Sequence, residues 1–185
     1  MIRTTRLCTL ALLVASFALT ALAADNNIDA AKSTLIATFK QEGVPVDAPF
    51  KTFSGRIVYD PANVAAASAA LDVDTASLDI GDDAYSAEVR KKAWFDSAAF
   101  PKATFRSTAI KAGAAGHFDA TGTLTVKGKA LTVTVPLTTQ NVAGGTAFDG
   151  SFAISRKAFG IGDPAWNDVL DDSVKVRFHL VSSNH

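Results

Sequence analysis

One charged residue in the segment FAISRKAFGIG, residues 152–162, is the clearest candidate for site chemistry in this sequence. Phe152 and Ile154 alternate with smaller residues, as in a strand with one apolar face, and the same period places Arg156 on that face. A guanidinium almost never faces an apolar interior without a partner. Its planar N–H groups suit a pyrophosphate, a quinone carbonyl or an amide. The first of two roles for Arg156 is therefore contact with a ligand head group at the mouth of the fold.

The second role for Arg156 is an internal salt bridge, because buried charges are usually paired. Such a bridge would fix the turn 157–170 against the end of the fold, and three aspartates are candidates for it: Asp96, Asp168 and Asp172. Gly160 and Gly162 permit positive φ, so the chain can turn tightly over that end. Both roles are compatible if a ligand and a carboxylate share the guanidinium.

Recognisable catalytic chemistry does not occur in the sequence. None of the three histidines, His117, His179 and His185, has a second histidine or a glutamate at metal-ligand spacing. The Gly-x-Ser-x-Gly motif of a nucleophile elbow is missing as well. Lys and Arg total 18 against 18 Asp and Glu, so no basic excess exists to hold nucleic acid. The sequence predicts no catalytic residue and no metal site, and favours a binding protein over an enzyme.

The first residues have the features of a secretory signal peptide. Arg3 and Arg6 precede the uncharged apolar run 7–22, and a small-x-small cleavage pattern ends at Ala23. The run is shorter than the roughly 20 residues that span a bilayer, which argues against a retained anchor. Cleavage after Ala23 would remove the single cysteine, Cys8, and leave residues 24–185 as one domain. An exported chain without cysteine is typical of the bacterial periplasm.

The remaining sequence is dominated by two-residue alternation rich in Thr, Val and Phe, which is typical of strands with one buried face. Eight strands are predicted, at 35–39, 53–59, 71–73, 103–108, 118–126, 131–138, 148–156 and 174–180. Glycine-containing hairpins are predicted at 127–129 and 143–145. Asp60-Pro61 predicts a short helical turn at 62–66, and capping acids followed by closing bases predict one helix over 83–94. Eight one-sided antiparallel strands form either a sandwich or a closed barrel.

The order of several motifs resembles the YceI-like family of bacterial periplasmic proteins over nearly all of the chain after residue 24. The motifs are Phe53-x-Gly55 with Ile57-x-Tyr59-Asp60; Trp94-Phe95-Asp96 followed by Phe100-Pro101-x-Ala103-x-Phe105-x-Ser107; Gly122-x-Leu124-Thr125-Val126-Lys127-Gly128; and ISRKAFGIG with Trp166. Ala158 departs from the family, since many relatives carry an acid there.

The resemblance implies an all-β fold, an antiparallel eight-stranded lipocalin-like β-barrel with one short helix and a helical turn in its connections. Members of the family enclose a long apolar tunnel and bind polyisoprenoid chains, isoprenoid quinones such as ubiquinone, or fatty amides. Small residues on the apolar faces likewise favour a cavity over a filled core. The predicted ligand-binding residues are Phe39, Phe53, Ile57, Trp94, Phe105, Leu124, Phe152, Ile154, Arg156, Trp166 and Phe178. The same residue types also build ordinary cores, and Trp166 suits either a lid or packing under the loop.

Two functions from different classes follow. The first is a periplasmic carrier or store for an isoprenoid lipid or quinone, with no cofactor other than such a bound lipid or ubiquinone. The second is a filled barrel that acts as a stress-associated interaction module, in transient contact with a membrane partner such as a cytochrome. A homodimer is compatible with both. Internal volume distinguishes them, because only the carrier needs a continuous apolar tunnel.

Overall fold

The computed structural model describes residues 27–183. The predicted signal peptide, residues 1–23, lies outside the described residues. Within the described part of the chain, no helix is both long enough and apolar enough to cross a membrane.

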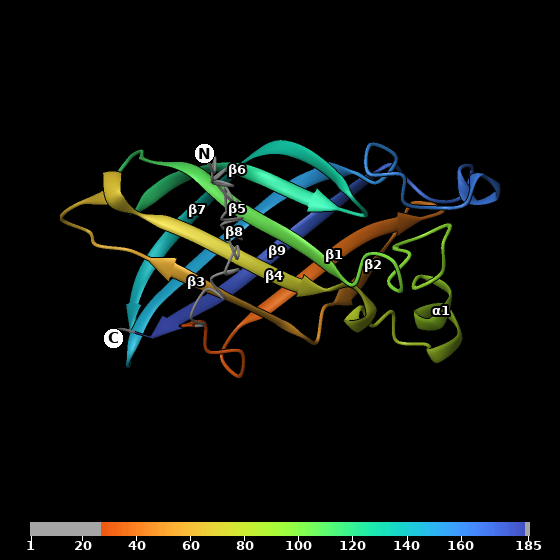
Figure 1. The fold of residues 1–185 in the computed structure, drawn as a ribbon, viewed down its shortest axis with the longest axis horizontal. Coiled ribbons are helices and arrows are strands. Elements are labelled where there is room, and N and C mark those ends of the chain that lie inside the picture. The colour runs from red at the N-terminus through yellow and green to blue at the C-terminus, as the bar shows by residue number, and fades with distance from the viewer. Residues whose placement is uncertain (1–26, 184–185) are drawn as a thin grey trace, which may run out of the picture.

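Nine antiparallel strands form a single curled sheet (Figure 1), which confirms the predicted all-β, lipocalin-like class. The strands are β1 (Thr34–Gln41), β2 (Val44–Pro49), β3 (Phe53–Val58), β4 (Ser68–Asp74), β5 (Lys102–Ala112), β6 (His117–Val126), β7 (Lys129–Val142), β8 (Gly145–Ser155) and β9 (Ser173–Ser183). Their order in the sheet is β2-β1-β9-β8-β7-β6-β5-β4-β3, so from β3 to β9 each strand lies beside its neighbours in sequence.

The predicted number of eight strands was wrong by one, because the sequence pattern missed β2. Pro45 and Pro49 lie within β2, and proline lacks the N–H that a central strand must donate. The strand occupies the edge of the sheet, where proline is tolerated. It returns along β1 through a tight turn in which Glu42 and Gly43 both have positive φ, 51° and 80°.

The two edge strands, β2 and β3, do not pair with each other among residues 27–183, and at one end segment 27–29 connects β3 with β9 instead. The Asn27 side chain forms two hydrogen bonds with the backbone of β3. Its Nδ2 donates to the Ile57 oxygen at 2.7 Å, and the Ile57 N–H donates to its Oδ1 at 2.9 Å. On the opposite side, the Ser183 N–H of β9 donates to the Asn27 oxygen at 2.9 Å. We call this arrangement the Asn27 clasp. It joins the edge strand β3 to the C-terminal strand β9.

Both predicted hairpins are present. Lys127 and Gly128 join β6 to β7 with positive φ values of 49° and 73°, the conformation of a tight hairpin whose twist matches its strands. Gly144, with φ 84°, lies in the turn between β7 and β8. These short connections fix the register that directs alternate side chains inward.

The predicted helix over 83–94 is correct at its start and too long at its end. Asp82 caps α1 (Asp83–Glu88) by accepting hydrogen bonds from two backbone N–H groups. The helix stops at Glu88, and the following residues form consecutive turns that end at Asp96, whose φ is 50°. The closing bases therefore lie in turns instead of in a last helical turn. A 3₁₀ helix, η1 (Val64–Ala66), falls in the predicted helical turn.

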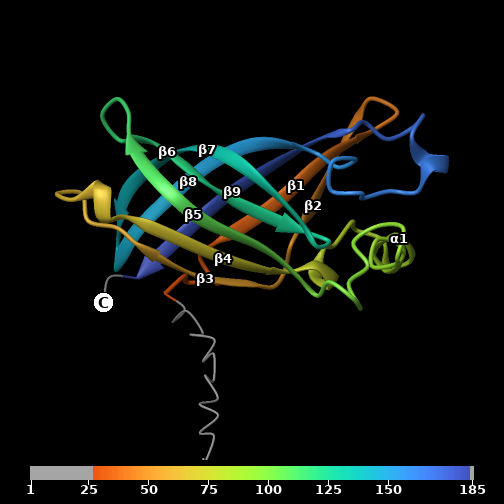
Figure 2. The same cartoon turned by 45° about the horizontal axis from the view of Figure 1, so that its top comes forward.

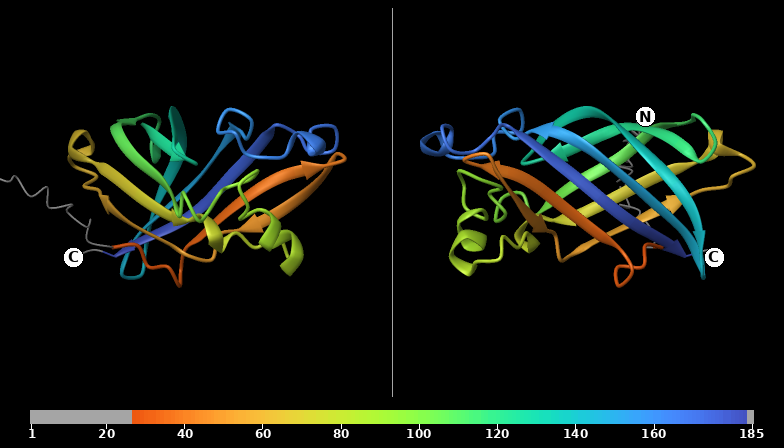
Figure 3. Two further views of the ribbon diagram at one scale, coloured as in Figure 1. Left: turned by 45° about the vertical axis from the view of Figure 1, so that its right-hand side comes forward. Right: turned by 180° about the vertical axis from the view of Figure 1, so that it is seen from behind.

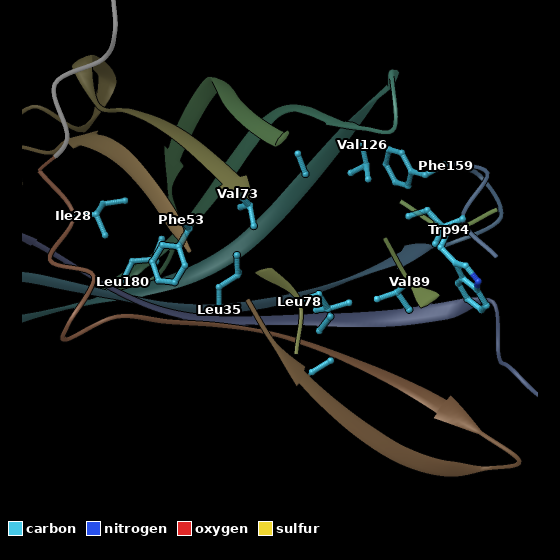
Figure 4. Close-up of a cluster of buried hydrophobic side chains, with 14 of the residues drawn as sticks. Ile28, Leu35, Phe53, Val73, Leu78, Val89, Trp94, Val126, Phe159 and Leu180 are labelled. Carbon is cyan, nitrogen blue, oxygen red and sulfur yellow. The ribbon is translucent and has the colours of Figure 1, made fainter. Parts of the chain in front are cut away.

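Two connections lie together at one end of the curled sheet. Figures 1 and 2 show α1 and the loop between β8 and β9 at the same end, while η1 and the C-terminal end of β9 lie at the other. Figure 3 shows the concave interior that the strands enclose. Buried apolar side chains are distributed along that interior, from Ile28 and Phe53 to Val89 and Trp94 (Figure 4).

Candidate functional site

An apolar cavity of about 280 Å³ occupies the interior of the curled sheet. Side chains from every strand except β2 line it, together with residues of α1 and of the loop between β8 and β9. Its volume is close to the lower end of the roughly 300–1,000 Å³ typical of small-molecule pockets. Nearly all of the lining surface is apolar. The inward halves of the alternating strands therefore form a wall around a space and do not fill it.

Two glycines let aromatic rings lie flat against this wall. A Cβ atom at Gly122 would lie 2.7 Å from Cζ of Phe105, and one at Gly150 would lie 2.5 Å from Cζ of Phe178. Both phenylalanines line the cavity, and each ring covers a glycine of the adjacent strand. A Cβ would also lie 2.4 Å from the Arg106 oxygen at Gly122 and 2.6 Å from the Pro136 oxygen at Gly150, so only glycine leaves room for these rings against the wall.

One end of the cavity is bordered by a cluster of three aromatic rings. Tyr59 contacts Phe118 and Phe148 edge to face, with ring centroids 5.7 Å and 5.4 Å apart. The Tyr59 hydroxyl lies 3.5 Å from Oγ1 of Thr139. All four residues line the cavity. The hydroxyls of Tyr59 and Thr139 therefore form at most a long hydrogen bond at this end of the cavity, beside two phenylalanine rings.

The other end holds the charged groups of the lining. Trp94 and Trp166 pack edge to face with centroids 6.2 Å apart, and Arg156 lines the cavity with them. Glu88 and Asp171 also contribute to the lining at this end. Trp166 therefore packs under the loop and borders the cavity at the same time.

Arg156 is only 4% exposed, and its guanidinium binds the loop that follows β8. It donates four hydrogen bonds: from Nε to the Asp171 oxygen at 3.0 Å, from Nη1 to the Ile161 oxygen at 3.1 Å, and from Nη2 to Asn167 Oδ1 at 3.1 Å and the Leu170 oxygen at 2.9 Å. Three of these acceptors are backbone carbonyls. The guanidinium thereby replaces the backbone donors that an irregular loop lacks.

The predicted salt bridge of Arg156 was wrong. No carboxylate of the described residues forms an ion pair with it, including the three candidates Asp96, Asp168 and Asp172. Asp172 instead accepts from the Ser155 hydroxyl at 2.7 Å and from the Lys157 N–H at 2.9 Å. Those hydrogen bonds, the backbone one first, lower the pKa of Asp172 below its ordinary value. Neutral oxygens satisfy the arginine because the loop brings its carbonyls closer than any carboxylate.

The packing of Arg156 explains why residue 162 is a glycine. Gly162 has a φ of 113°, and a Cβ there would lie 2.3 Å from Nη1 of Arg156. Its N–H donates to the Ala93 oxygen at 2.9 Å, which ties the loop to the segment after α1. Only glycine fits beside the guanidinium in this backbone conformation.

Ten of the eleven predicted binding residues line the cavity: Phe39, Ile57, Trp94, Phe105, Leu124, Phe152, Ile154, Arg156, Trp166 and Phe178. Phe53 lies instead in the buried core beside the cavity, 9% exposed. Their contact with a ligand stays a prediction. The prediction missed the Tyr59, Phe118 and Phe148 cluster, although Phe118 and Phe148 are buried residues of β6 and β8 and Tyr59 directly follows β3.

One pair of titratable side chains outside the cavity lies within hydrogen-bond distance on β8 and β9. His179 Nδ1 lies 2.7 Å from a carboxylate oxygen of Asp149 on the outer face of β8 and β9. Among residues 27–183, no group of three or more His, Cys, Asp or Glu side chains has a geometry that suits a metal ion.

Comparison with known proteins gives this cavity a family context. The model of the YceI-like domain matches residues 27–182, which include all nine strands but the last residue of β9. The chain belongs to the YceI-like family. The crystal structure of Burkholderia cenocepacia BcnA is 43% identical, with a TM-score of 0.82 over 84% of this chain and 99% of that one.

A solved structure of lower identity shares the fold, and a further relative matches part of the sequence. A polyisoprenoid binding domain from Saccharophagus degradans, implicated in plant cell wall breakdown, is 20% identical with a TM-score of 0.67, over 85% of this chain and 97% of that domain. A UPF0312 protein of Vibrio cholerae is 32% identical over 118 residues, 60% of this chain and 62% of the relative. The match therefore spans less than two thirds of that relative's length.

Proposed function

We propose that this protein binds a long apolar ligand in the cavity and carries or stores it in the periplasm, without chemistry of its own. The ligand classes are a polyisoprenoid, an isoprenoid quinone such as ubiquinone, or a fatty amide. The observation that carries the proposal is the apolar cavity, lined from the Tyr59 cluster at one end to the tryptophan pair at the other.

The driving force for such binding is the removal of apolar surface from water, about 25 cal/mol for each Å². A linear chain gains most from a narrow apolar space, because both its own surface and that of the wall leave water. The Saccharophagus domain, whose name states that it binds polyisoprenoid, supports this ligand class through the shared fold.

The alternative function, a filled barrel that serves as an interaction module, requires a packed interior. A cavity of about 280 Å³ favours the carrier. A transient membrane or cytochrome partner, or a homodimer, would then serve in loading and unloading the ligand.

Charge substitutions in the wall test the proposal. Phe105→Glu and Phe152→Glu each place a carboxylate in the apolar lining, so lipid uptake should be abolished while the protein is still exported and folded. Ala153→Glu is the matched control, since Ala153 follows Phe152 in β8 and is exposed on the opposite face. Uptake of ubiquinone or prenyl lipid is measured by extraction from purified protein. Undiminished uptake in both wall variants would show that the ligand lies elsewhere.

A further inference from the structure

The guanidinium of Arg156 is a buried positive charge at the end of an apolar cavity, and no carboxylate of residues 27–183 forms an ion pair with it. Four of its five N–H groups donate to neutral oxygens of the loop, three of them backbone carbonyls. The fifth N–H, on Nη1, has no hydrogen-bond partner within residues 27–183. The residue lines the cavity although it is only 4% exposed.

Neutral acceptors satisfy the hydrogen bonds, and the Asp172 carboxylate attracts the guanidinium only from beyond ion-pair distance, so the charge is incompletely compensated in a poorly solvated place, which is costly. An anionic oxygen would both accept the remaining N–H and neutralise the charge, and such charge-assisted bonds are about twice as strong as neutral ones. We propose that the cavity prefers single-chain lipids with a small oxyanion head, a carboxylate or a phosphate, held by Nη1 of Arg156. This proposal rests on the proposed function and names the head group of its ligand.

The surroundings of Nη1 are consistent with a head-group site. Gly162 offers no side chain where a Cβ would lie 2.3 Å from Nη1, and the same Cβ would lie 3.6 Å from Cζ3 of Trp94. The other charged groups of the lining are acidic, Glu88 and Asp171. Glu88 forms an ion pair with Lys91 on its outer side, and Asp171 is exposed, so water screens both carboxylates better than it screens the buried guanidinium.

The position of the tryptophans supplies a direct reporter. The chain's two tryptophans, Trp94 and Trp166, lie at the Arg156 end, while the opposite end holds Tyr59 and two phenylalanines. An oxyanion at Arg156 thus fixes the ligand's direction, with its head beside the tryptophans and its tail toward the Tyr59 cluster.

The first test compares ligands of equal chain in the delipidated wild-type protein: palmitate with palmityl alcohol, and farnesyl phosphate with farnesol. Each anion should bind about tenfold to a hundredfold more tightly than its alcohol, the range expected for a hydrogen bond to a charged group. Preference within the first pair alone indicates a carboxylate site, and within the second pair alone a phosphate site. Equal affinity within both pairs would overturn the proposal while leaving the proposed function intact. Failure of all four to bind would overturn this proposal, and the uptake of ubiquinone by the wild-type protein would then decide the proposed function separately.

Variants separate the head-group role from the structural one. Arg156→Met should remove the preference for the anion over its alcohol, measured as the ratio of the two affinities within the same variant, whereas Arg156→Lys should retain part of that preference. Asn167→Ala is the control, since it removes one hydrogen bond of the loop and keeps the charge. Persistence of the full preference in Arg156→Met would overturn the proposal.

A second measurement needs only the wild-type protein, so it holds even if the methionine variant does not fold. Palmitate brominated beside the carboxylate should quench tryptophan fluorescence more strongly than palmitate brominated at its terminal carbon. Equal or reversed quenching would show that Arg156 holds the loop only and takes no head group.

Discussion

The Asn27 clasp gives the sharpest prediction about how the barrel is held closed. Asn27→Ala removes both side-chain hydrogen bonds to Ile57, at 2.7 Å and 2.9 Å, and keeps the backbone bonds of residue 27. At about 1 kcal/mol net for each bond, the free energy of unfolding should fall by about 2 kcal/mol. In a domain of this size that loss lowers the melting temperature by roughly 4–8 °C.

Two readouts check the clasp. Thermal unfolding followed by circular dichroism gives the change in melting temperature, and hydrogen exchange should show faster exchange of the Ile57 amide than in the wild type. Asn63→Ala is the matched control, because Asn63 is exposed and its side chain forms no capping hydrogen bond with η1. A melting temperature equal to that of the control would refute the reasoning, since the backbone hydrogen bonds of residue 27 and apolar packing would then suffice to hold the seam.

Three further predictions concern the ends of the cavity. Gly162→Ala, which combines a φ of 113° with a contact of 2.3 Å, should cost more than about 2 kcal/mol in urea unfolding, while Gly81→Ala, whose φ is 84° in open space, should cost about 1 kcal/mol. Asp172 has a pKa lowered below 3.8 in the folded state, so its stabilisation is present above that value and is lost as the pH falls through the folded pKa. Asp172→Asn should therefore lose less stability than the wild type between about pH 5 and about pH 2; parallel urea midpoints would contradict this. Tyr59→Leu, which removes two edge-to-face ring contacts, should cost about 1–3 kcal/mol, whereas Tyr59→Phe should be nearly neutral, both by thermal unfolding.

The alternation of apolar residues predicted most of the fold, because a two-residue period determines both the strand and its buried face. It failed at β2, where Pro45, Asp47 and Pro49 interrupt the pattern. An edge strand needs only one hydrogen-bonded neighbour, so its sequence is less constrained than that of a central strand.

The residues of the cavity wall were largely predictable from the sequence, whereas the connection of β3 to β9 through Asn27 was not. Phe105 and Phe178 follow the alternation, so their inward direction is readable from the sequence, whereas Phe53 follows the same rule and packs in the core. Alternation tells which face is buried but not whether that face meets a space or another side chain. Asn27 gave no signal, because its role depends on a strand 30 residues away.

Arg156 shows the same limit for charges. The two-residue period of the strand predicted that Arg156 is buried. It did not predict which groups would accept its hydrogen bonds. The choice between a carboxylate and a set of carbonyls depends on the path of the loop, where Gly162 and Asn167 bring oxygens to the guanidinium. The path of this loop cannot be predicted from the alternation of apolar residues in the strands beside it.

The most direct test of the central claim is native mass spectrometry of the protein expressed with residues 1–23 and purified from a periplasmic extract, followed by organic extraction of any adduct. The account predicts one apolar-chain lipid for each protein molecule, released on denaturation. A bare protein mass, unchanged after incubation with ubiquinone, prenyl lipids and long-chain acids, would contradict it.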